Sequence, residues 1–180
     1  MSAVFWVSLF LIVYPYAIYP LALWLWGRVR SRPITRASIE PSVSVLIPAY
    51  NEAGAIAATL GAMLAQDYPK HLMQILVVSD CSEDGTDDIV RTFADQGVEL
   101  LRMPERGGKA LGLNAAVRHA RGEIVVFCDA NARFAPSAVR NFVRNFADPS
   151  VGYVTGTLTL ESPDGVNQGG GAYLLSLIHI

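Results

Sequence analysis

Short apolar runs alternate along this chain with segments in which apolar residues recur at helical spacing. The apolar runs predict strands over about 42–47, 74–79, 98–102, 123–128 and 151–160. The helical spacing predicts helices over about 53–66, 84–96, 108–120 and 136–146. Strands and helices that alternate in this order are typical of an α/β fold with a doubly wound, mostly parallel sheet.

Three of the predicted strands run directly into polar, acidic clusters. The clusters are Pro48-Ala49-Tyr50-Asn51-Glu52, Asp80-Cys81-Ser82-Glu83-Asp84-Gly85 and Asp129-Ala130-Asn131. The preceding runs are apolar on both faces, which suits parallel strands covered by helices on both sides. Because ligands of such sheets bind at the carboxyl ends of the strands, the three clusters predict a single site.

The first part of the chain has a different pattern. Residues 3–26 contain no charged side chain, and a helix of this length would be about 36 Å long, enough to cross a hydrocarbon core of roughly 30 Å. Pro15 and Pro20 predict a bend, which membrane helices tolerate. A cleaved signal peptide is the alternative. Its basic start and small-residue cleavage site are missing here. We therefore expect one uncleaved transmembrane helix over 3–27.

A basic linker, residues 28–41, follows this predicted anchor. It carries Arg28, Arg30, Arg32 and Arg36. By the positive-inside rule these arginines place the rest of the chain in the cytosol, at the cell membrane. They are also suited to contact anionic membrane lipid headgroups.

Charge and cysteine content narrow the class of protein. Of 14 basic and 16 acidic residues, ten basic and all sixteen acidic ones lie beyond these arginines, a net charge of about −6. An acidic surface of this kind argues against nucleic acid as a partner. The two cysteines, Cys81 and Cys128, are too few for a disulfide framework and fit a reducing compartment.

The first polar cluster has two interpretations. Pro48 fixes the backbone as the chain leaves the sheet, Tyr50 is suited to cover a flat base or ribose, and Glu52 is suited to a cation or a ligand hydroxyl. Alternatively, the segment only begins a helix, with Asn51 as its N-cap and Glu52 favoured by the helix dipole.

In the second cluster we expect a ligand contact only from Asp80. It follows the strand directly, where a carboxylate can accept a hydrogen bond from the imide N–H of a base such as uracil. The remaining acidic residues favour a turn that caps the next helix. They are Glu83, Asp84, Asp87 and Asp88.

Two further motifs suit an anionic ligand. Gly107-Gly108-Lys109 opens a predicted helix with flexible glycines, free N–H groups and a lysine, which together make an anion site, although a solvated turn is the alternative. Asp129 and Asn131 bear oxygens two residues apart, a pair that suits Mg²⁺ or Mn²⁺ against a diphosphate, with an Asx turn as the alternative.

Several common kinds of active site are missing from the sequence. It contains no Walker motif, no Gly-x-Gly-x-x-Gly after the first strand and no zinc-ligand spacing. The histidines are His71, His119 and His179, and none lies at a predicted strand end beside an acid. We expect no catalytic role for His71 or His119.

The order of the motifs resembles glycosyltransferase family 2 over about residues 41–156. It reads Pro-Ala-Tyr-Asn-Glu, Ser-Asp-x-Ser-x-Asp-Gly-Thr, Gly-Gly-Lys-Ala-x-x-Leu-Asn and Val-Val-Phe-x-Asp-Ala-Asn. The resemblance implies a GT-A fold, inversion at the sugar anomeric carbon, and a UDP-sugar donor with Mg²⁺ or Mn²⁺. The anchor and arginine linker resemble membrane-bound members that build cell-surface polysaccharides or glycolipids.

The resemblance also implies roles for individual residues. Those lining the nucleotide pocket would be Pro48, Ala49, Tyr50 and Glu52. Asp80 would contact uracil, Lys109 would lie near the diphosphate or nucleotide, and Asp129 would lie near ribose and metal.

Two positions depart from the family pattern. Ser79 stands where many members have an Asp, and Asn131 replaces the second Asp of Asp-x-Asp, the usual metal ligand. Asn131 can still coordinate through its carbonyl oxygen, but it contributes no charge.

The catalytic residue is not identified. In the family the general base is an Asp well beyond the fifth strand, and no residue here matches it, so we expect 42–160 to be the donor-binding part of the GT-A domain. Residues 161–180 are expected to be a loop and a truncated or non-native tail, with a short C-terminal strand as the alternative.

The activity implied is inverting sugar transfer to a polysaccharide or glycolipid acceptor at the cytosolic membrane face. A polyprenyl-phosphate sugar transferase is the alternative within the enzyme class. A non-catalytic nucleotide-binding membrane scaffold or sensor is the alternative of another class.

Overall fold

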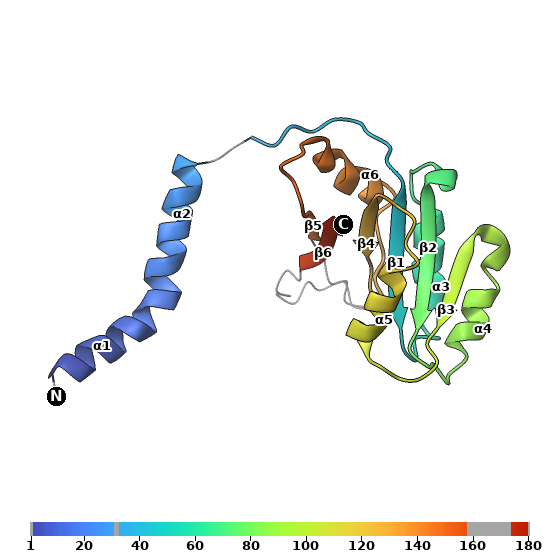
Figure 1. The fold of residues 1–180 in the computed structure, drawn as a ribbon, viewed down its shortest axis with the longest axis horizontal. Helices are drawn as coiled ribbons and strands as arrows, with labels where there is room; N and C mark the ends of the chain where they lie inside the picture. Colours follow the sequence, from blue (N-terminus) through green and yellow to red (C-terminus); the bar gives the residue numbers. More distant parts are fainter. Residues whose placement is uncertain (1, 31–32, 158–173, 180) are drawn as a thin grey trace, which may run out of the picture. The chain divides into compact units, whose positions relative to one another are not determined.

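The structure is a computed structural model that describes residues 2–30, 33–157 and 174–179. The chain divides into two units, Met1–Ile34 and Thr35–Ile180 (Figure 1). The division falls inside the predicted basic linker.

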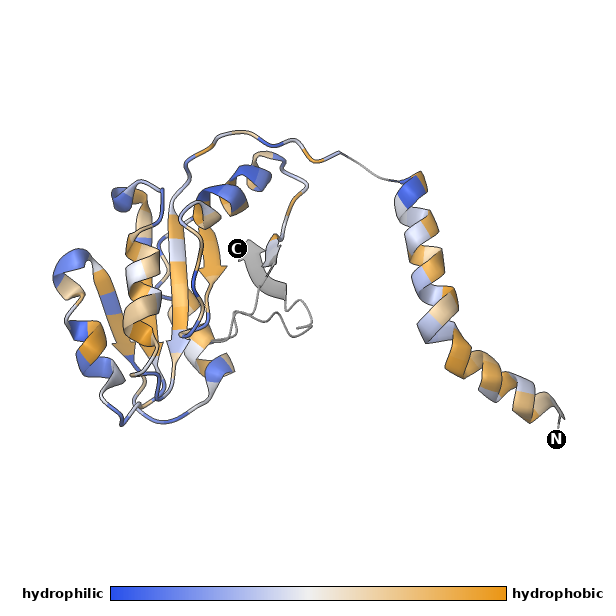
Figure 2. Ribbon diagram, turned by 180° about the vertical axis from the view of Figure 1, so that it is seen from behind, coloured by the Kyte–Doolittle hydropathy of each residue, from blue (hydrophilic) through white to orange (hydrophobic). Residues whose placement is uncertain are grey.

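The first unit is an apolar helical stretch. It consists of α1 (Ser2–Val13), the π-helical turn η1 (Tyr14–Ile18) and α2 (Tyr19–Val29). The span Ala3–Val29 contains an 18-residue window with a mean hydropathy of 1.8, and its length and composition suffice to cross a membrane. Figure 2 shows α1 as mostly hydrophobic, whereas in α2 hydrophobic residues alternate with residues of intermediate hydropathy.

The bend predicted at the two prolines is centred on the π turn. The Tyr19 N–H donates to the Tyr14 carbonyl, five residues earlier, and Pro15 has no N–H to donate. π turns and prolines are the usual causes of a kinked helix. In Figure 1, α1 and α2 meet at an angle at this point.

The second unit is built on a six-stranded sheet with the order β3-β2-β1-β4-β6-β5. The parallel strands are β1 (Val43–Ala49), β2 (Met73–Ser79), β3 (Val98–Arg102) and β4 (Ile124–Phe127). The antiparallel ones are β5 (Thr155–Thr157) and β6 (Leu174–His179). The predicted mostly parallel α/β sheet is therefore confirmed.

The last two strands differ from the expected arrangement. Within the described residues the predicted strand 151–160 is reduced to β5, which pairs antiparallel with β6. Gly152 and Gly156 weaken strand formation in this run. In the segment 161–180, predicted as a loop and a truncated or non-native tail, residues 174–179 form β6, which was the alternative. Residues 161–173 and 180 lie outside the described residues.

The helices occupy the predicted ranges but are shorter at their ends. The α-helices are α3 (Ile56–Leu64), α4 (Thr86–Arg91), α5 (Lys109–Val117) and α6 (Ala138–Val143). Short 3₁₀ turns are η2 (Lys70–Leu72), η3 (Ala94–Gln96) and η4 (Arg144–Ala147).

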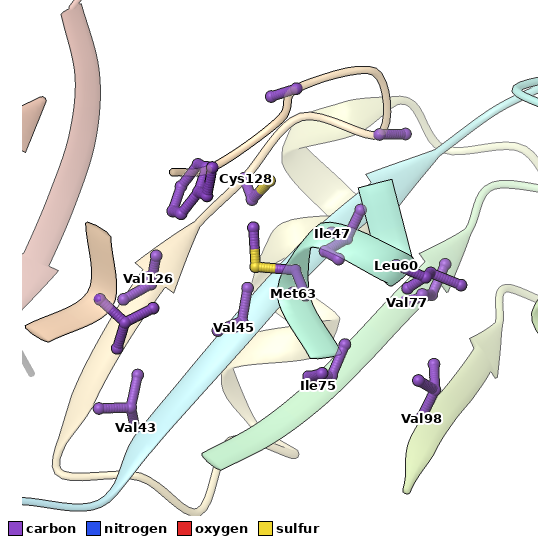
Figure 3. Packing of buried hydrophobic residues seen from close by; sticks show 14 of the residues in the cluster. Val43, Val45, Ile47, Leu60, Met63, Ile75, Val77, Val98, Val126 and Cys128 are labelled. Atoms are coloured by element: carbon purple, nitrogen blue, oxygen red, sulfur yellow. The ribbon is translucent and has the colours of Figure 1, made fainter. Parts of the chain in front are cut away.

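The helices cover both faces of the sheet, as the doubly wound prediction requires. On one face, α3, α4 and α6 contribute Leu60, Val90 and Val139 to a core with β-strand residues such as Val45 (Figure 3). On the other face, α5 contributes Ala116 to a second core. Its other buried members are the strand residues Leu46, Leu76, Val78 and Val125. This two-sided burial explains why the strands are continuous apolar runs.

Gly122 permits a close approach between its own backbone and the backbone of Val43 and Ser44 in β1. A Cβ atom at Gly122 would lie 2.4 Å from the Ser44 nitrogen and 2.5 Å from the Val43 carbonyl carbon. We expect Gly122→Ala to lower the free energy of unfolding by about 3 kcal/mol or more, because the clash is with backbone.

Gly61→Ala is the matched control, because no atom lies within 4 Å of its added Cβ. It lies in α3, so we expect it to raise stability by about 0.5–1 kcal/mol. Urea unfolding followed by circular dichroism measures both effects. An unchanged unfolding midpoint for Gly122→Ala would contradict the packing described.

Candidate functional site

A pocket with a volume of about 290 Å³ opens where β1, β2 and β4 end. The eight residues predicted to bind donor or metal all line it: Pro48, Ala49, Tyr50, Glu52, Asp80, Lys109, Asp129 and Asn131. Gly108 and Ala130, which belong to the predicted motifs, line it as well, and sequence analysis missed two further lining residues, Val78 and Gly112. The structure thus brings the predicted residues together, as expected for clusters at parallel strand ends.

The strand register explains this convergence. Ala49 in β1 pairs with Ser79 in β2, the residue before Asp80. Leu46 pairs with Phe127, the last residue of β4, and accepts a hydrogen bond from the Cys128 N–H at 3.1 Å. Asp80 and Asp129 therefore leave the sheet on either side of β1.

Pro48 lies inside β1 rather than after it. It stands two residues beyond Leu46, so its backbone faces the β4 side of β1, where β4 has already ended. A proline without an N–H is tolerated there because no ladder hydrogen bond is lost.

The Asp80 carboxylate holds the loop in front of α5. Oδ1 accepts from the Gly107 N–H at 2.7 Å, and Oδ2 accepts from the Gly108 N–H at 2.8 Å. The two N–H groups predicted to be free for an external anion are thus occupied by an internal one. That prediction is corrected here: sequence spacing does not reveal a partner 27 residues away. Each carboxylate oxygen keeps a further lone pair for a ligand.

Lys109 begins α5 and reaches across the pocket to the third cluster. Its Nζ donates to Asp129 Oδ1 at 2.5 Å. The two side chains are 63% and 48% exposed, and exposed ion pairs of this kind contribute at most about 1 kcal/mol. Charges on a ligand can therefore replace this contact at little cost.

The loop between β1 and α3 is tied to the loop between β2 and α4. Asn51 has a positive φ of 54°, and its Oδ1 accepts from the Glu83 N–H at 2.9 Å. The helix begins only at Ile56, with Ala55 as N-cap. The alternative in which Asn51 caps this helix is therefore wrong, because its side chain serves the neighbouring loop.

The same pair of loops orients the backbone at Glu52. The Glu52 N–H donates to Thr86 Oγ1 at 2.8 Å, and the Ala53 N–H donates to Asp84 Oδ2 at 2.9 Å. Hydrogen bonds from the Thr86 hydroxyl and then from the Ala53 N–H hold the pKa of Asp84 below its usual value. Asp84 also accepts from the Thr86 N–H at the start of α4, as the capping interpretation predicts.

Other acidic residues of the second cluster have structural roles. Asp87 and Asp88 lie in the first turn of α4, where negative charge is favourable. Asp87 is buried and pairs with Arg102 from β3.

Arg106 is a neighbour of the pocket that sequence analysis missed. Its guanidinium carbon lies 4.0 Å from the centre of the Tyr50 ring, within the range of a cation–π contact. Arg106 directly precedes the two glycines held by Asp80, so its loop is fixed at two points. The available signal was its position beside Gly107-Gly108-Lys109.

Cys128, His71 and His119 provide no reactive group in the pocket. Burial first, and then the negative charge of Asp129, raises the pKa of the Cys128 thiol to about 12. The thiol is therefore protonated and a poor nucleophile at neutral pH. Neither His71 nor His119 lines the pocket, and the His179 side chain lies outside the described residues.

The donor atoms at the third cluster suit a divalent cation. Asp129 offers a carboxylate and Asn131 an amide carbonyl on one pocket wall, and Mg²⁺ and Mn²⁺ prefer oxygen ligands. Residues 2–30, 33–157 and 174–179 contain no group of three or more His, Cys, Asp or Glu side chains placed to hold a metal. The two residues therefore fit a cation that takes its other ligands from a bound molecule or water.

Asp80→Ala tests the contact with the glycine loop. We expect amide hydrogen exchange at Gly107 and Gly108 to accelerate tenfold or more, since a hydrogen bond to a charged group contributes about 1.5–3 kcal/mol. Asp88→Ala, which removes an 82% exposed carboxylate outside the pocket, is the control. Exchange rates that stay at the wild-type value in Asp80→Ala would contradict the contact.

Thiol alkylation tests the state of Cys128. In a Cys81→Ser variant, we expect iodoacetamide at pH 8 to label the folded protein at least about 100-fold more slowly than the urea-unfolded protein. The raised pKa leaves almost no thiolate at that pH, and burial hinders access. Labelling would accelerate as pH rises toward 12; equal folded and unfolded rates at pH 8 would count against this description.

Known proteins are similar to this chain in sequence and in fold. Residues 44–171 match glycosyl transferase family 2. Glycosyltransferase AglE from Haloferax volcanii is 34% identical over 127 residues, which cover 69% of this chain and 42% of that protein. Poly-beta-1,6-N-acetyl-D-glucosamine synthase from Staphylococcus epidermidis is 27% identical over 161 residues, covering 82% of this chain and 38% of the synthase. The chain spans less than half the length of these two relatives.

Two solved structures confirm the predicted GT-A-like α/β fold. Mannosyltransferase PcManGT from Pyrobaculum calidifontis, in complex with GDP-Man and Mn²⁺, has a TM-score of 0.71 at 36% identity, over 86% of this chain and 46% of its own. S. aureus TarS 1-349 in complex with UDP has a TM-score of 0.53 at 28% identity, over 56% of this chain and 30% of its own. From the match over residues 44–171 and these likenesses, the chain belongs to glycosyl transferase family 2.

Proposed function

We propose that this chain binds a nucleoside diphosphate sugar, specifically a UDP-sugar, as the donor of a glycosyltransferase. The observation that carries the proposal is the convergence of Asp80, Lys109 and Asp129 in one pocket at the carboxyl ends of the parallel strands. In this assignment Asp80 contacts the base edge, Lys109 contacts the diphosphate, and Asp129 lies near the ribose or metal. The structural relatives support this class of ligand, because their complexes contain GDP-Man or UDP.

At the nucleoside end, we assign Tyr50 and Asp80. Tyr50 is backed by Arg106, which holds the ring as a wall of the pocket. The Asp80 carboxylate is fixed by Gly107 and Gly108 and retains acceptor capacity for an imide N–H. A fixed acceptor selects a base by its donor pattern.

At the diphosphate end, we assign Lys109, Asp129 and Asn131. Lys109 supplies a positive charge beside a helix start, where anions are favoured. Asp129 and Asn131 would hold Mg²⁺ or Mn²⁺ through oxygen atoms. When bound, such a cation supplies positive charge that stabilises a departing diphosphate.

The reaction implied is a single displacement with inversion. An acceptor hydroxyl oxygen bonds to the anomeric carbon, and the bond from that carbon to the diphosphate oxygen breaks, with its electron pair leaving on the nucleoside diphosphate. The hydroxyl proton goes to a general base. No residue of this chain is assigned as that base, so its own contribution is to bind and orient the donor.

We also propose that the helix Ala3–Val29 anchors the domain at the cytosolic face of the cell membrane. Its length and hydropathy suit a span. Near its end, Arg28 lies 4.0 Å from the Trp24 ring and Arg30 lies 4.8 Å from the Trp26 ring. Such aromatic and basic pairs suit a lipid–water interface. An anchored domain fits an acceptor that is a growing polysaccharide or a lipid-linked glycan.

Calorimetry of the full chain in detergent tests donor binding. We expect UDP to bind in the presence of Mn²⁺, and Asp129→Ala to weaken its binding at least about tenfold, a loss of about 1.4 kcal/mol. Asp95→Ala, an exposed substitution outside the pocket, is expected to leave binding unchanged. The absence of UDP binding with and without Mn²⁺ would refute the proposal, whereas preferential GDP binding would refute the assignment of the base.

A further inference from the structure

The cation site on this chain carries little negative charge of its own. Within the described ranges, no three acidic, histidine or cysteine side chains are grouped to hold a metal. Asn131 adds an oxygen without charge, so Asp129 is the carboxylate of the Asp-x-Asn pair. Mg²⁺ and Mn²⁺ are hard cations that bind several oxygen ligands. The described residues alone therefore offer an incomplete site.

The single carboxylate is also already neutralised. The Lys109 ammonium donates to Asp129 Oδ1 at 2.5 Å. A cation that approached Asp129 in the free protein would meet this positive charge at contact range. The Lys109 ammonium therefore occupies the carboxylate that a divalent cation would otherwise bind.

Lys109 is free to leave Asp129 without any change in the fold. Its backbone follows Gly107 and Gly108, which Asp80 fixes through both carboxylate oxygens. Its side chain is 63% exposed, so only the flexible stem has to rotate. A diphosphate in the pocket would attract the ammonium and at the same moment offer anionic oxygens to a cation beside Asp129.

We infer that Lys109 and Asn131 make cation binding conditional on the nucleotide: Lys109 is the counter-ion of Asp129 in the free protein, and Mg²⁺ or Mn²⁺ binds only together with the donor diphosphate. This inference rests on the proposed function and assigns its order of binding. The exchange moves no covalent bond. Lys109 passes from carboxylate to diphosphate, and the carboxylate passes from ammonium to cation.

Mn²⁺ binding to the full chain in detergent tests the inference without measuring catalysis. Electron paramagnetic resonance reports free Mn²⁺, and a parallel titration of UDP without protein corrects for the complex in solution. We expect wild-type protein to bind Mn²⁺ about 100-fold more tightly with UDP than without it, within the range of measured couplings between sites. Equal affinity with and without UDP would overturn the inference while leaving the proposed function intact.

Two variants separate the contributions of charge. Asn131→Asp adds a carboxylate and is expected to tighten Mn²⁺ binding without UDP about tenfold. Lys109→Met removes the competing ammonium and is expected to do the same while weakening UDP binding. Lys70→Met, which removes the other lysine of the chain and lies outside the pocket, is the matched control.

The outcomes are distinguishable. If both site variants keep the wild-type affinity for Mn²⁺ in the absence of UDP, the assignment of Lys109 and Asn131 is wrong. If wild-type protein fails to bind UDP with or without Mn²⁺, the proposed function fails and this inference fails with it. A tenfold gain in Lys109→Met, with none in Lys70→Met, supports the exchange, and a tenfold gain in Asn131→Asp supports the role assigned to Asn131.

Discussion

The pairing of β1 in parallel with both β2 and β4 is the constraint on which the rest of the structure depends. It makes β1 a central strand with a neighbour on each side, and it brings three strand ends to one edge of the sheet. Residues more than 75 positions apart in sequence, such as Pro48 and Asp129, meet there because the register aligns their strands. The apolar strands thus create the position of the pocket, and the polar residues that follow them create its chemistry.

Fixed and exchangeable charges divide the work within this pocket. Asp80 is buried, and backbone N–H groups hold both of its oxygens, so its position is set by the fold. Lys109 and Asp129 are exposed and paired only through side chains, so a ligand can rearrange them. Asp80 supports the loop from which the Lys109 side chain projects. A fixed group suits recognition of a ligand, whereas a group that changes its partner when a ligand binds must be free to move.

Apolar periodicity was sufficient to predict the parallel strands and the helices, and the abrupt polar ends of three strands predicted one site. The full set of eight pocket residues also required the resemblance to glycosyltransferase family 2. The contact of Asp80 with Gly107 and Gly108 was beyond prediction, since it depends on a loop conformation that leaves no periodic trace. The sequence also left open whether Asn51 caps a helix, because it does not reveal that the Asn51 backbone has a positive φ and that its side chain bonds a neighbouring loop. The position of β6 beside β4 is set by long-range antiparallel pairing, which local patterns do not encode.

A crystal structure of the full chain with UDP and Mn²⁺, with the anomalous signal of manganese, tests the central claim most directly. The account predicts the diphosphate between Lys109 and Asp129, the uracil beside Tyr50 and Asp80, and an anomalous peak at coordination distance from Asp129. It also predicts that the Lys109 ammonium has left Asp129 for the diphosphate. Nucleotide bound elsewhere, or manganese bound with the Lys109–Asp129 ion pair still intact, would contradict it.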